Sequence, residues 1–183
     1  MTSLDRPDVR LRPSWAEAVA EFTEAGEVMH GSGLWDFDPL DTSAAGAAGA
    51  ARVLEHLLGQ ADPANVAEGL VPCTFFWITD GEGDDRSFVG YLALRHALTP
   101  RLLEEGGHIG YAVRPTRRGE GHATRALRLA LAEAAALGLD RVLLTADDDN
   151  VASWRVMEHV GAVHEDTRGE VRRYWIRTTP EMV

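Results

Sequence analysis

Residues Arg117 to Ala123 read Arg-Arg-Gly-Glu-Gly-His-Ala, and these residue types at this spacing suit the binding of an anion. Gly119 and Gly121 tolerate positive φ and let the backbone approach a ligand without a Cβ collision. The stretch from Gly121 to about Leu137 is rich in alanine and leucine and predicts a helix that begins at this loop. Because the first turn of a helix leaves N–H groups unpaired at the positive end of its dipole, the loop predicts a phosphate site.

The same loop also fits a simpler interpretation, an ordinary glycine-rich helix start whose arginines are solvated. Two other phosphate-binding loops fit the sequence poorly. A Walker loop requires Gly-Lys-Ser/Thr, which this stretch lacks, and the dinucleotide motif requires a third glycine where the chain has Thr124. The kind of phosphate therefore has to be inferred from the elements around the loop.

The stretch before the loop, residues 107–114, predicts a strand that Pro115 ends. Side chains alternate between the faces of a strand, so Gly110 and Ala112 share one face with His108. That face is nearly bare apart from the imidazole, and we expect it to leave room for reacting groups.

The rest of the chain predicts the elements that position the loop. Ser14 and Glu17 have the spacing of a capping box at the start of a helix. No internal repeat or domain linker interrupts the chain, so we expect one domain over residues 1–183. The predicted order is a strand (8–12), two helices (14–23, 44–60), three strands (74–79, 87–96, 107–114), a helix (121–137), a strand (141–145), a helix (149–160) and two strands (163–166, 171–177).

Composition excludes several classes of protein. A formal charge of −11 disfavours general binding to nucleic acids or anionic membranes; it is compatible with a cationic acceptor, although solubility alone also explains it. Cys73 is the single cysteine, so an internal disulfide is excluded, no zinc-binding spacing is present, and we expect no metal. A buried, inert thiol is the expected state of Cys73, with a nucleophilic role as the alternative.

The first residues and the hydropathy of the chain indicate its location. Residues 1–12 carry charges of both signs and no apolar segment, unlike a signal peptide. No stretch approaches the ~18 apolar residues of a membrane span. We therefore expect a cytoplasmic protein, and a homodimer is possible because dimers are the commonest soluble assembly.

The element order and local motifs together resemble the GNAT superfamily, the Gcn5-related N-acetyltransferases, best over residues 72–177. The family's loop pattern, Arg/Gln-x-x-Gly-x-Gly/Ala, is met by Arg118, Gly121 and Ala123. Residues 149–162, from Asp-Asn-Val-Ala-Ser to Val-Gly-Ala, are similar to the family's next helix and its end. The run 95–115 looks like a bacterial branch of predicted acetyltransferases. The resemblance implies an α/β (α+β) fold with a central mixed, mostly antiparallel sheet flanked by helices.

The resemblance also implies acetyl-CoA as the acyl donor and its pyrophosphate as the anion at the loop. The residues expected to bind it, mainly through the backbone, are Arg117, Arg118, Gly119, Glu120, Gly121, His122 and Ala123. By the same resemblance, the backbone of Tyr111 and Val113 would pair with the pantetheine arm. Asn150 and Ser153 match family positions that contact this arm, and a helix-capping role for Asn150 is compatible with that contact.

Acetyl transfer to a primary amine by direct attack requires a base, because only a neutral amine is nucleophilic. His108 is the first candidate, since an imidazole titrates in the right pH range; a structural histidine is the alternative. His96, on the neighbouring predicted strand, is the second candidate. Glu104 and Glu105 precede the strand and could also serve, although we expect them to be solvated.

One position departs from the common family pattern. Many members carry a tyrosine seven residues after the helix-starting asparagine, as the acid that protonates the leaving thiolate. Here that position is Met157, which cannot donate a proton. Tyr174, Ser153 or water would then supply it, or the thiolate would leave unassisted.

The acceptor cannot be read from the motifs, and three functions stay open. The first is acetylation of a small-molecule amine, the second a non-catalytic acyl-CoA-binding or regulatory module, and the third a protein N-terminal or lysine acetyltransferase. In this family the N-terminal region borders the acceptor, so Trp35 with Asp36 and Asp38 could line that site; a surface loop is the alternative. Trp15 lies in the same region.

Overall fold

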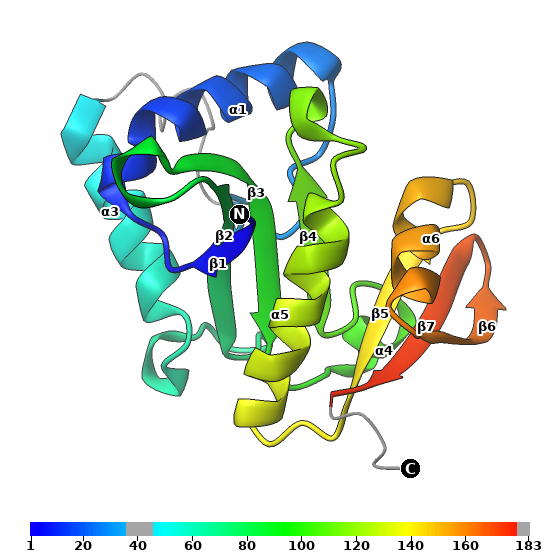
Figure 1. Cartoon of the computed structure of the whole chain (residues 1–183). Helices are drawn as coiled ribbons and strands as arrows, with labels where there is room; N and C mark the ends of the chain where they lie inside the picture. The colour runs from blue at the N-terminus through cyan, green and yellow to red at the C-terminus, as the bar shows by residue number, and fades with distance from the viewer. Residues whose placement is uncertain (36–45, 179–183) are drawn as a thin grey trace.

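The computed structural model describes residues 1–35 and 46–178, in which helices cover both faces of one twisted sheet (Figure 1). The strands are β1 (Ser3–Asp5), β2 (Cys73–Asp80), β3 (Ser87–Arg95), β4 (Ile109–Val113), β5 (Arg141–Asp147), β6 (Val163–Arg168) and β7 (Val171–Arg177). The helices are α1 (Arg12–Ala25), α3 (Gly46–Gly59), α4 (Pro100–Glu104), α5 (His122–Ala136) and α6 (Val151–His159). Short 3₁₀ turns span Val9–Leu11, Pro63–Asn65, Gly83–Asp85 and Pro115–Arg117.

The sheet has seven strands in the order β1-β2-β3-β4-β5-β7-β6. Every described neighbour pair is antiparallel except β4 with β5, which run parallel. This arrangement confirms the predicted fold class, a mixed and mostly antiparallel sheet flanked by helices. The single parallel pair lies at the centre of the sheet, and its first strand, β4, directly precedes the predicted phosphate loop.

Two apolar cores lie on the two faces of the sheet, as the alternation along β2 illustrates. Phe76 and Ile78 face the core under α5 and α6, whereas Phe75 and Trp77 face the core under α1 and α3. Trp77 is 1% exposed and its ring packs against that of Trp15 at 5.2 Å between centroids. Burying a large apolar side chain contributes about 1.5–3 kcal/mol, so both faces hold the central strands in place.

The start of the chain differs from the prediction. Residues 8–12 form a 3₁₀ turn and the first residue of α1 instead of a strand, and the first strand is β1, which pairs with β2. Pro13 stands in the first turn of α1, where a missing N–H costs nothing, so the helix begins before Ser14. Ser14 does not cap the helix; its hydroxyl donates to the Leu11 carbonyl and accepts from the Phe88 N–H at 2.9 Å, which ties α1 to β3.

Three further findings concern single features of the described chain. Cys73 is buried, and burial raises the pKa of its thiol to about 12, which favours the inert state over a nucleophile. Within residues 1–35 and 46–178, no group of three or more His, Cys, Asp or Glu side chains could hold a metal ion. None of the helices in this part of the chain is long and apolar enough to cross a membrane.

Candidate functional site

Strands β4 and β5 separate soon after they meet. Their one register pair in the described chain is Ile109 with Leu144, next to the hydrogen bond from the His108 N–H to the Leu143 carbonyl at 2.7 Å. On its other side β4 stays paired with β3 as far as Val113. The β5-facing edge of β4 is therefore open over its last residues.

The backbone groups on that open edge belong to Tyr111 and Val113. Alternate residues of a strand point their N–H and C=O groups to the same side. The Arg114 N–H bonds to the Val89 carbonyl of β3, so the residues two and four positions before Arg114 also face β3, and those between them face away from it. Tyr111 and Val113 consequently face the opening toward β5. The Val113 carbonyl accepts a hydrogen bond from Arg118 Nε at 3.0 Å. A ligand with amide bonds would therefore pair with the other backbone groups on this edge, the Val113 N–H and the N–H and C=O of Tyr111.

The loop that follows β4 delivers the start of α5 to the same opening. Gly119 and Gly121 both have positive φ, +78° and +80°, a backbone conformation that favours glycine. Gly121 is the N-cap of α5, and no side chain caps the helix there. The first N–H groups of α5 therefore keep their capacity to bind an anion at the positive end of the helix dipole.

The two arginines of the loop are held in ion pairs. Arg117 contacts Asp80 at 3.0 Å and Glu120 at 2.9 Å, and its side chain thus joins the loop to the end of β2. Arg118 pairs with Glu27, which follows α1. Each guanidinium fixes the loop on a neighbouring element, and the adjacent carboxylates offset part of the charge that was expected to face a phosphate.

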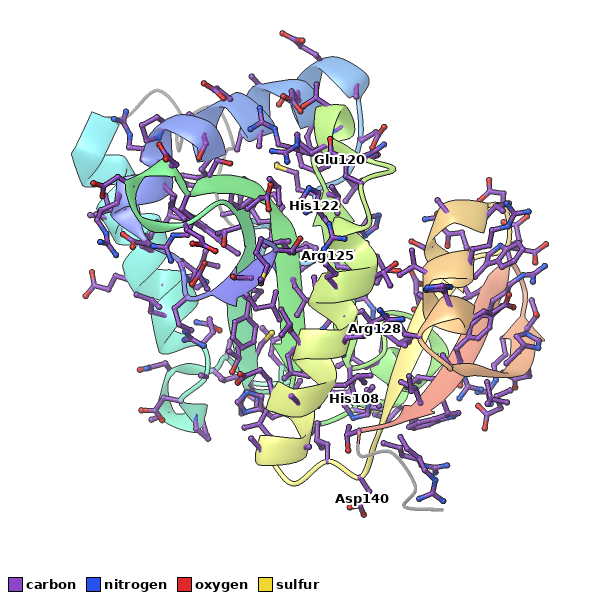
Figure 2. The ribbon with its side chains drawn as sticks, in the orientation of Figure 1. His108, Glu120, His122, Arg125, Arg128 and Asp140 are labelled. Carbon is purple, nitrogen blue, oxygen red and sulfur yellow. The ribbon has the colours of Figure 1, made fainter. Side chains whose placement is uncertain are left out.

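His122 is buried, and both ring nitrogens of its imidazole lie within hydrogen-bond distance of neighbouring side chains. The Thr2 hydroxyl accepts from Arg125 Nε at 2.7 Å, which leaves its own proton for His122 Nδ1 at 2.8 Å. His122 Nε2 lies 3.0 Å from a carboxylate oxygen of Glu120 and 3.2 Å from Nη2 of Arg117. Figure 2 shows Glu120, His122 and Arg125 together at the start of α5, where they anchor the loop to the N-terminal residues.

The face of β4 opposite Tyr111 is covered at Gly110. A Cβ on Gly31 would lie 2.3 Å from the Gly110 carbonyl oxygen and 3.1 Å from the Ala93 nitrogen, so the backbone of Gly31 packs directly on β3 and β4. The prediction that this bare face leaves room for reactants is therefore wrong at Gly110. The small residues there admit another segment of the chain.

His108 lies at the start of β4 and is 6% exposed. Its Nδ1 accepts a hydrogen bond from the Leu143 N–H at 2.9 Å, which leaves the proton of the neutral ring on Nε2. Burial, and then the charge of Arg95, lower the pKa of His108 from 6.5 to about 4. Both features favour a structural role over that of a base, because the one lone pair that could take a proton is engaged by the backbone.

His96 lies further from the opening. The backbone N–H of His96 donates a hydrogen bond to the Pro72 carbonyl at 2.8 Å, and its ring Nε2 lies 2.8 Å from the Thr74 hydroxyl oxygen. These contacts hold it against β2, on the far side of β3 from the opening. Figure 2 places His108 near the end of α5 that is remote from Glu120, and His96 follows β3 at that same end of the sheet.

Helix α6 borders the opening from the β5 side. Asn150 caps α6 by accepting from the Ser153 N–H at 3.1 Å, which confirms its predicted capping role. The carbonyl of Ser153 accepts a hydrogen bond from the Tyr111 hydroxyl at 3.2 Å, so a side chain of β4 reaches across to α6. Met157, one turn further along α6, is 1% exposed and belongs to the core.

The other residues considered for catalysis are occupied elsewhere. Tyr174 is fully buried on β7, beyond β5, and its hydroxyl donates to Glu158 Oε1 at 3.1 Å. Glu104 pairs with Arg168, and Glu105 is solvent-exposed, as expected. Trp35 is 65% exposed, while Asp36 and Asp38 lie outside the described residues.

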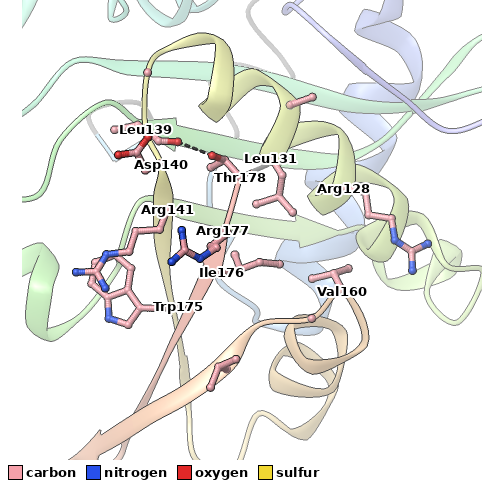
Figure 3. A pocket seen from close by; sticks show the side chains of 14 residues that line it. Arg128, Leu131, Leu139, Asp140, Arg141, Val160, Trp175, Ile176, Arg177 and Thr178 are labelled. Carbon is pink, nitrogen blue, oxygen red and sulfur yellow. Dashed lines mark hydrogen bonds between the residues drawn. The ribbon is translucent and has the colours of Figure 1, made fainter. Parts of the chain in front are cut away.

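A separate hollow of about 1150 Å³ opens beside the C-terminal half of α5 (Figure 3). Leu131, Val160 and Ile176 line it, together with Arg128 and Arg141. It shares no residue with the loop 115–121 or with β4. The hollow is thus not part of the site described above.

The residues present fit coenzyme A. An uncapped helix start suits a pyrophosphate, and the open backbone edge at Tyr111 and Val113 suits an arm that carries amide bonds. Sequence reasoning missed three parts of this site: the Glu27 partner of Arg118, the cover at Gly31 and the reach of the Tyr111 side chain. Of these three, only the cover at Gly31 had a sequence signal, the Gly-Ser-Gly run over residues 31–33.

Comparisons with known proteins agree with the fold of the chain. Residues 9–163 match the family profile of the acetyltransferase (GNAT) domain. No curated protein sequence matches the chain.

Solved structures show the same fold. Mycobacterium smegmatis RimJ in complex with CoA-disulfide has a TM-score of 0.65 at 23% identity, over 96% of this chain and 81% of RimJ. RimL, a ribosomal L7/L12 alpha-N-protein acetyltransferase in complex with coenzyme A, has a TM-score of 0.58 at 18% identity, over 96% and 93%. The microcin C7 self-immunity acetyltransferase MccE, in complex with acetyl-CoA and AMP, has a TM-score of 0.58 at 11% identity, over 96% and 92%.

Proposed function

The chain belongs to the GNAT acetyltransferases, and we propose that it transfers the acetyl group of acetyl-CoA to a primary amine by direct attack in a ternary complex. One observation carries the proposal: β4 and β5 diverge beyond the Ile109–Leu144 pair, and the uncapped start of α5 follows β4 at the open end of this gap. The opening would take the pantetheine arm along Tyr111 and Val113. The helix start would take the pyrophosphate, at the backbone of residues 118–123.

In this proposal the chain accelerates the reaction mainly by positioning acetyl-CoA and the amine, and less by acid–base chemistry. Two reactants held in the right geometry react as if at very high concentration, which accounts for much of the rate of such a transfer. We assign the removal of the amine proton to water, because His108 Nδ1 is occupied by the Leu143 N–H and His96 is bonded to β2. His108 then acts as a positioning residue that sets where β4 and β5 part.

The acceptor is proposed to be a cationic small molecule with a primary amine. Residues 1–41, in the N-terminal region that borders the acceptor in this family, contain nine acidic residues and only three basic ones. Such a region attracts a cation and disfavours an anion. A protein α-amino group is the second candidate, since the likeness to RimJ and RimL extends over 96% of the chain.

Two measurements test the proposal. Isothermal titration should show that the full chain binds both CoA and acetyl-CoA, and absence of binding would refute it. Release of free thiol should then be followed with acetyl-CoA and a panel of polyamines, amino sugars and short peptides with free N-termini. Turnover with the small amines supports the favoured acceptor, turnover with the peptides alone supports the second, and binding without any turnover would indicate a non-catalytic acyl-CoA-binding module.

A further inference from the structure

The position at which the family carries a hydrogen-bond donor for the leaving thiolate has no donor in this chain. When the amine nitrogen forms its bond to the acetyl carbon, the carbon–sulfur bond breaks and the electron pair stays on sulfur. Sulfur therefore becomes a thiolate, which a nearby hydrogen-bond donor stabilises as its charge develops. Met157 is buried and has no donor, and the Tyr174 hydroxyl is bonded to Glu158 beyond β5.

Tyr111 is the tyrosine that lies at the opening itself. Its backbone belongs to the edge of β4 that faces β5, and its side chain lies on the side of the sheet that carries α5 and α6. The hydroxyl donates to the Ser153 carbonyl at 3.2 Å and so bridges β4 and α6 beside the opening. That carbonyl belongs to the α6 turn that precedes Met157, so a phenol from β4 lies beside the helix position where the family carries its own.

We propose that the Tyr111 hydroxyl donates a hydrogen bond to the leaving thiolate of coenzyme A and replaces the tyrosine absent at Met157. This inference rests on the proposed function and adds a residue to it. On binding of the donor, the hydroxyl would turn from the Ser153 carbonyl to the sulfur. The bond between carbon and sulfur breaks toward sulfur, the amine proton passes to water, and the thiolate takes up its proton from solvent after release.

The phenol stabilises the charge without giving up its own proton. Burial raises the pKa of Tyr111 to about 12, well above the ~8.5 typical of a thiol, so full transfer to sulfur is uphill. A neutral donor beside a developing anion is the arrangement found in oxyanion holes. Its effect is therefore measurable on bound CoA itself, as a lower pKa of the CoA thiol.

The test is a titration of the thiol of bound CoA, followed by the ultraviolet absorbance of the thiolate, in the unmodified chain, in Tyr111→Phe and in Tyr174→Phe. A hydrogen bond to a charged group changes a pKa by about one unit or more, so the bound thiol should titrate at least about one unit higher in Tyr111→Phe. Acetyl transfer should fall roughly ten- to a hundredfold in the same variant. Tyr174→Phe also removes a hydroxyl bonded to α6, so it controls for a loosened helix.

The outcomes separate this inference from the proposed function. An unchanged thiol pKa in Tyr111→Phe, or an equal rise in Tyr174→Phe, would overturn the inference while CoA binding by the unmodified chain still stands. Absence of CoA binding would remove both. If Tyr111→Phe does not fold, 3-fluorotyrosine at position 111 keeps the side chain and makes it a stronger donor, so the bound thiol must then titrate lower than in the unmodified chain; no change would again overturn the inference.

Discussion

The imidazole of His108 accepts a hydrogen bond from the backbone N–H of Leu143 at 2.9 Å, so a side chain at the start of β4 takes the place of a backbone acceptor for β5. The next residues, Ile109 and Leu144, form the one register pair between these strands in the described chain. Beyond it the strands diverge and the opening begins. The histidine therefore marks where the pairing of β4 with β5 starts, at the closed end of the opening.

Replacement of His108 by asparagine should preserve acetyl transfer. The Asn side-chain oxygen can accept from the Leu143 N–H as Nδ1 does, so we expect kcat/KM within about threefold of the unmodified value and an unchanged pH–rate profile. His108→Leu removes the acceptor, and a buried unpaired N–H costs about 1–3 kcal/mol of unfolding free energy. A loss of about 10²–10⁴ in rate in both variants, with loss of the alkaline rise, would instead identify His108 as the base.

The same histidine should make stability depend on pH. Its pKa in the folded chain is about 4, below the ordinary 6.5, so between these values the unfolded chain binds a proton that the folded chain does not. The contribution of neutral His108 to the free energy of unfolding is fully present above pH 6.5. It is lost as the pH falls toward 4, by about 3 kcal/mol in total. Urea unfolding at pH 7.5, 5.5 and 4.5 should show a smaller decrease for His108→Asn than for the unmodified chain, and parallel decreases would contradict this assignment.

Local sequence patterns predicted most of the sheet and the loop before α5 well. Apolar and aromatic runs bounded by glycine and proline predicted β2, β3, β4, β5 and β7, and the two-glycine loop before an alanine-rich run predicted the start of α5. The first strand was misplaced, because the short alternation over 8–12 competes with Pro13, which is well suited to a first helical turn. Three-residue strands such as β1 are defined by their partner and carry little signal of their own.

The side-chain chemistry of the site could not be predicted in the same way. The contact of Arg118 with Glu27 joins residues 91 positions apart, and that of Tyr111 with Ser153 joins residues 42 apart. Neither distance follows from a local period. The expectation for His108 placed it on the right strand but did not include the Leu143 N–H, because a backbone group of another strand leaves no trace in the sequence around the histidine.

Substitution of Gly121 by glutamate should abolish binding of CoA. Gly121 caps α5 with φ of +80°, so the change adds backbone strain and places a negative charge at the expected phosphate position. Gly138→Glu is the matched control, because Gly138 also has φ of +80° but lies beyond the other end of α5. Isothermal titration should detect no binding by a folded Gly121→Glu chain and normal binding by Gly138→Glu. Equal affinities in the two variants would contradict the placement of the pyrophosphate.

Replacement of Glu27 by glutamine should strengthen the binding of CoA. The Arg118 side chain lies 3.0 Å from a Glu27 carboxylate oxygen, and this contact holds the pKa of Glu27 below its usual range. Neutralising the carboxylate leaves the positive charge of Arg118 without its partner, one residue before Gly119. We expect the Kd for CoA to fall about two- to fivefold at low salt, in line with the ~0.2–1 kcal/mol of exposed charge pairs. The gain should shrink as salt is added, since these groups are partly exposed.

A second carboxylate shows whether the gain is local. Glu24→Gln removes the same charge near the end of α1, from a side chain that forms no ion pair within residues 1–35 and 46–178. A general change in net charge would affect the affinity equally in both variants. If Glu27→Gln instead weakens binding, Arg118 contributes chiefly by fixing the loop on the segment after α1. The Glu27 carboxylate is then part of what keeps the phosphate site in shape.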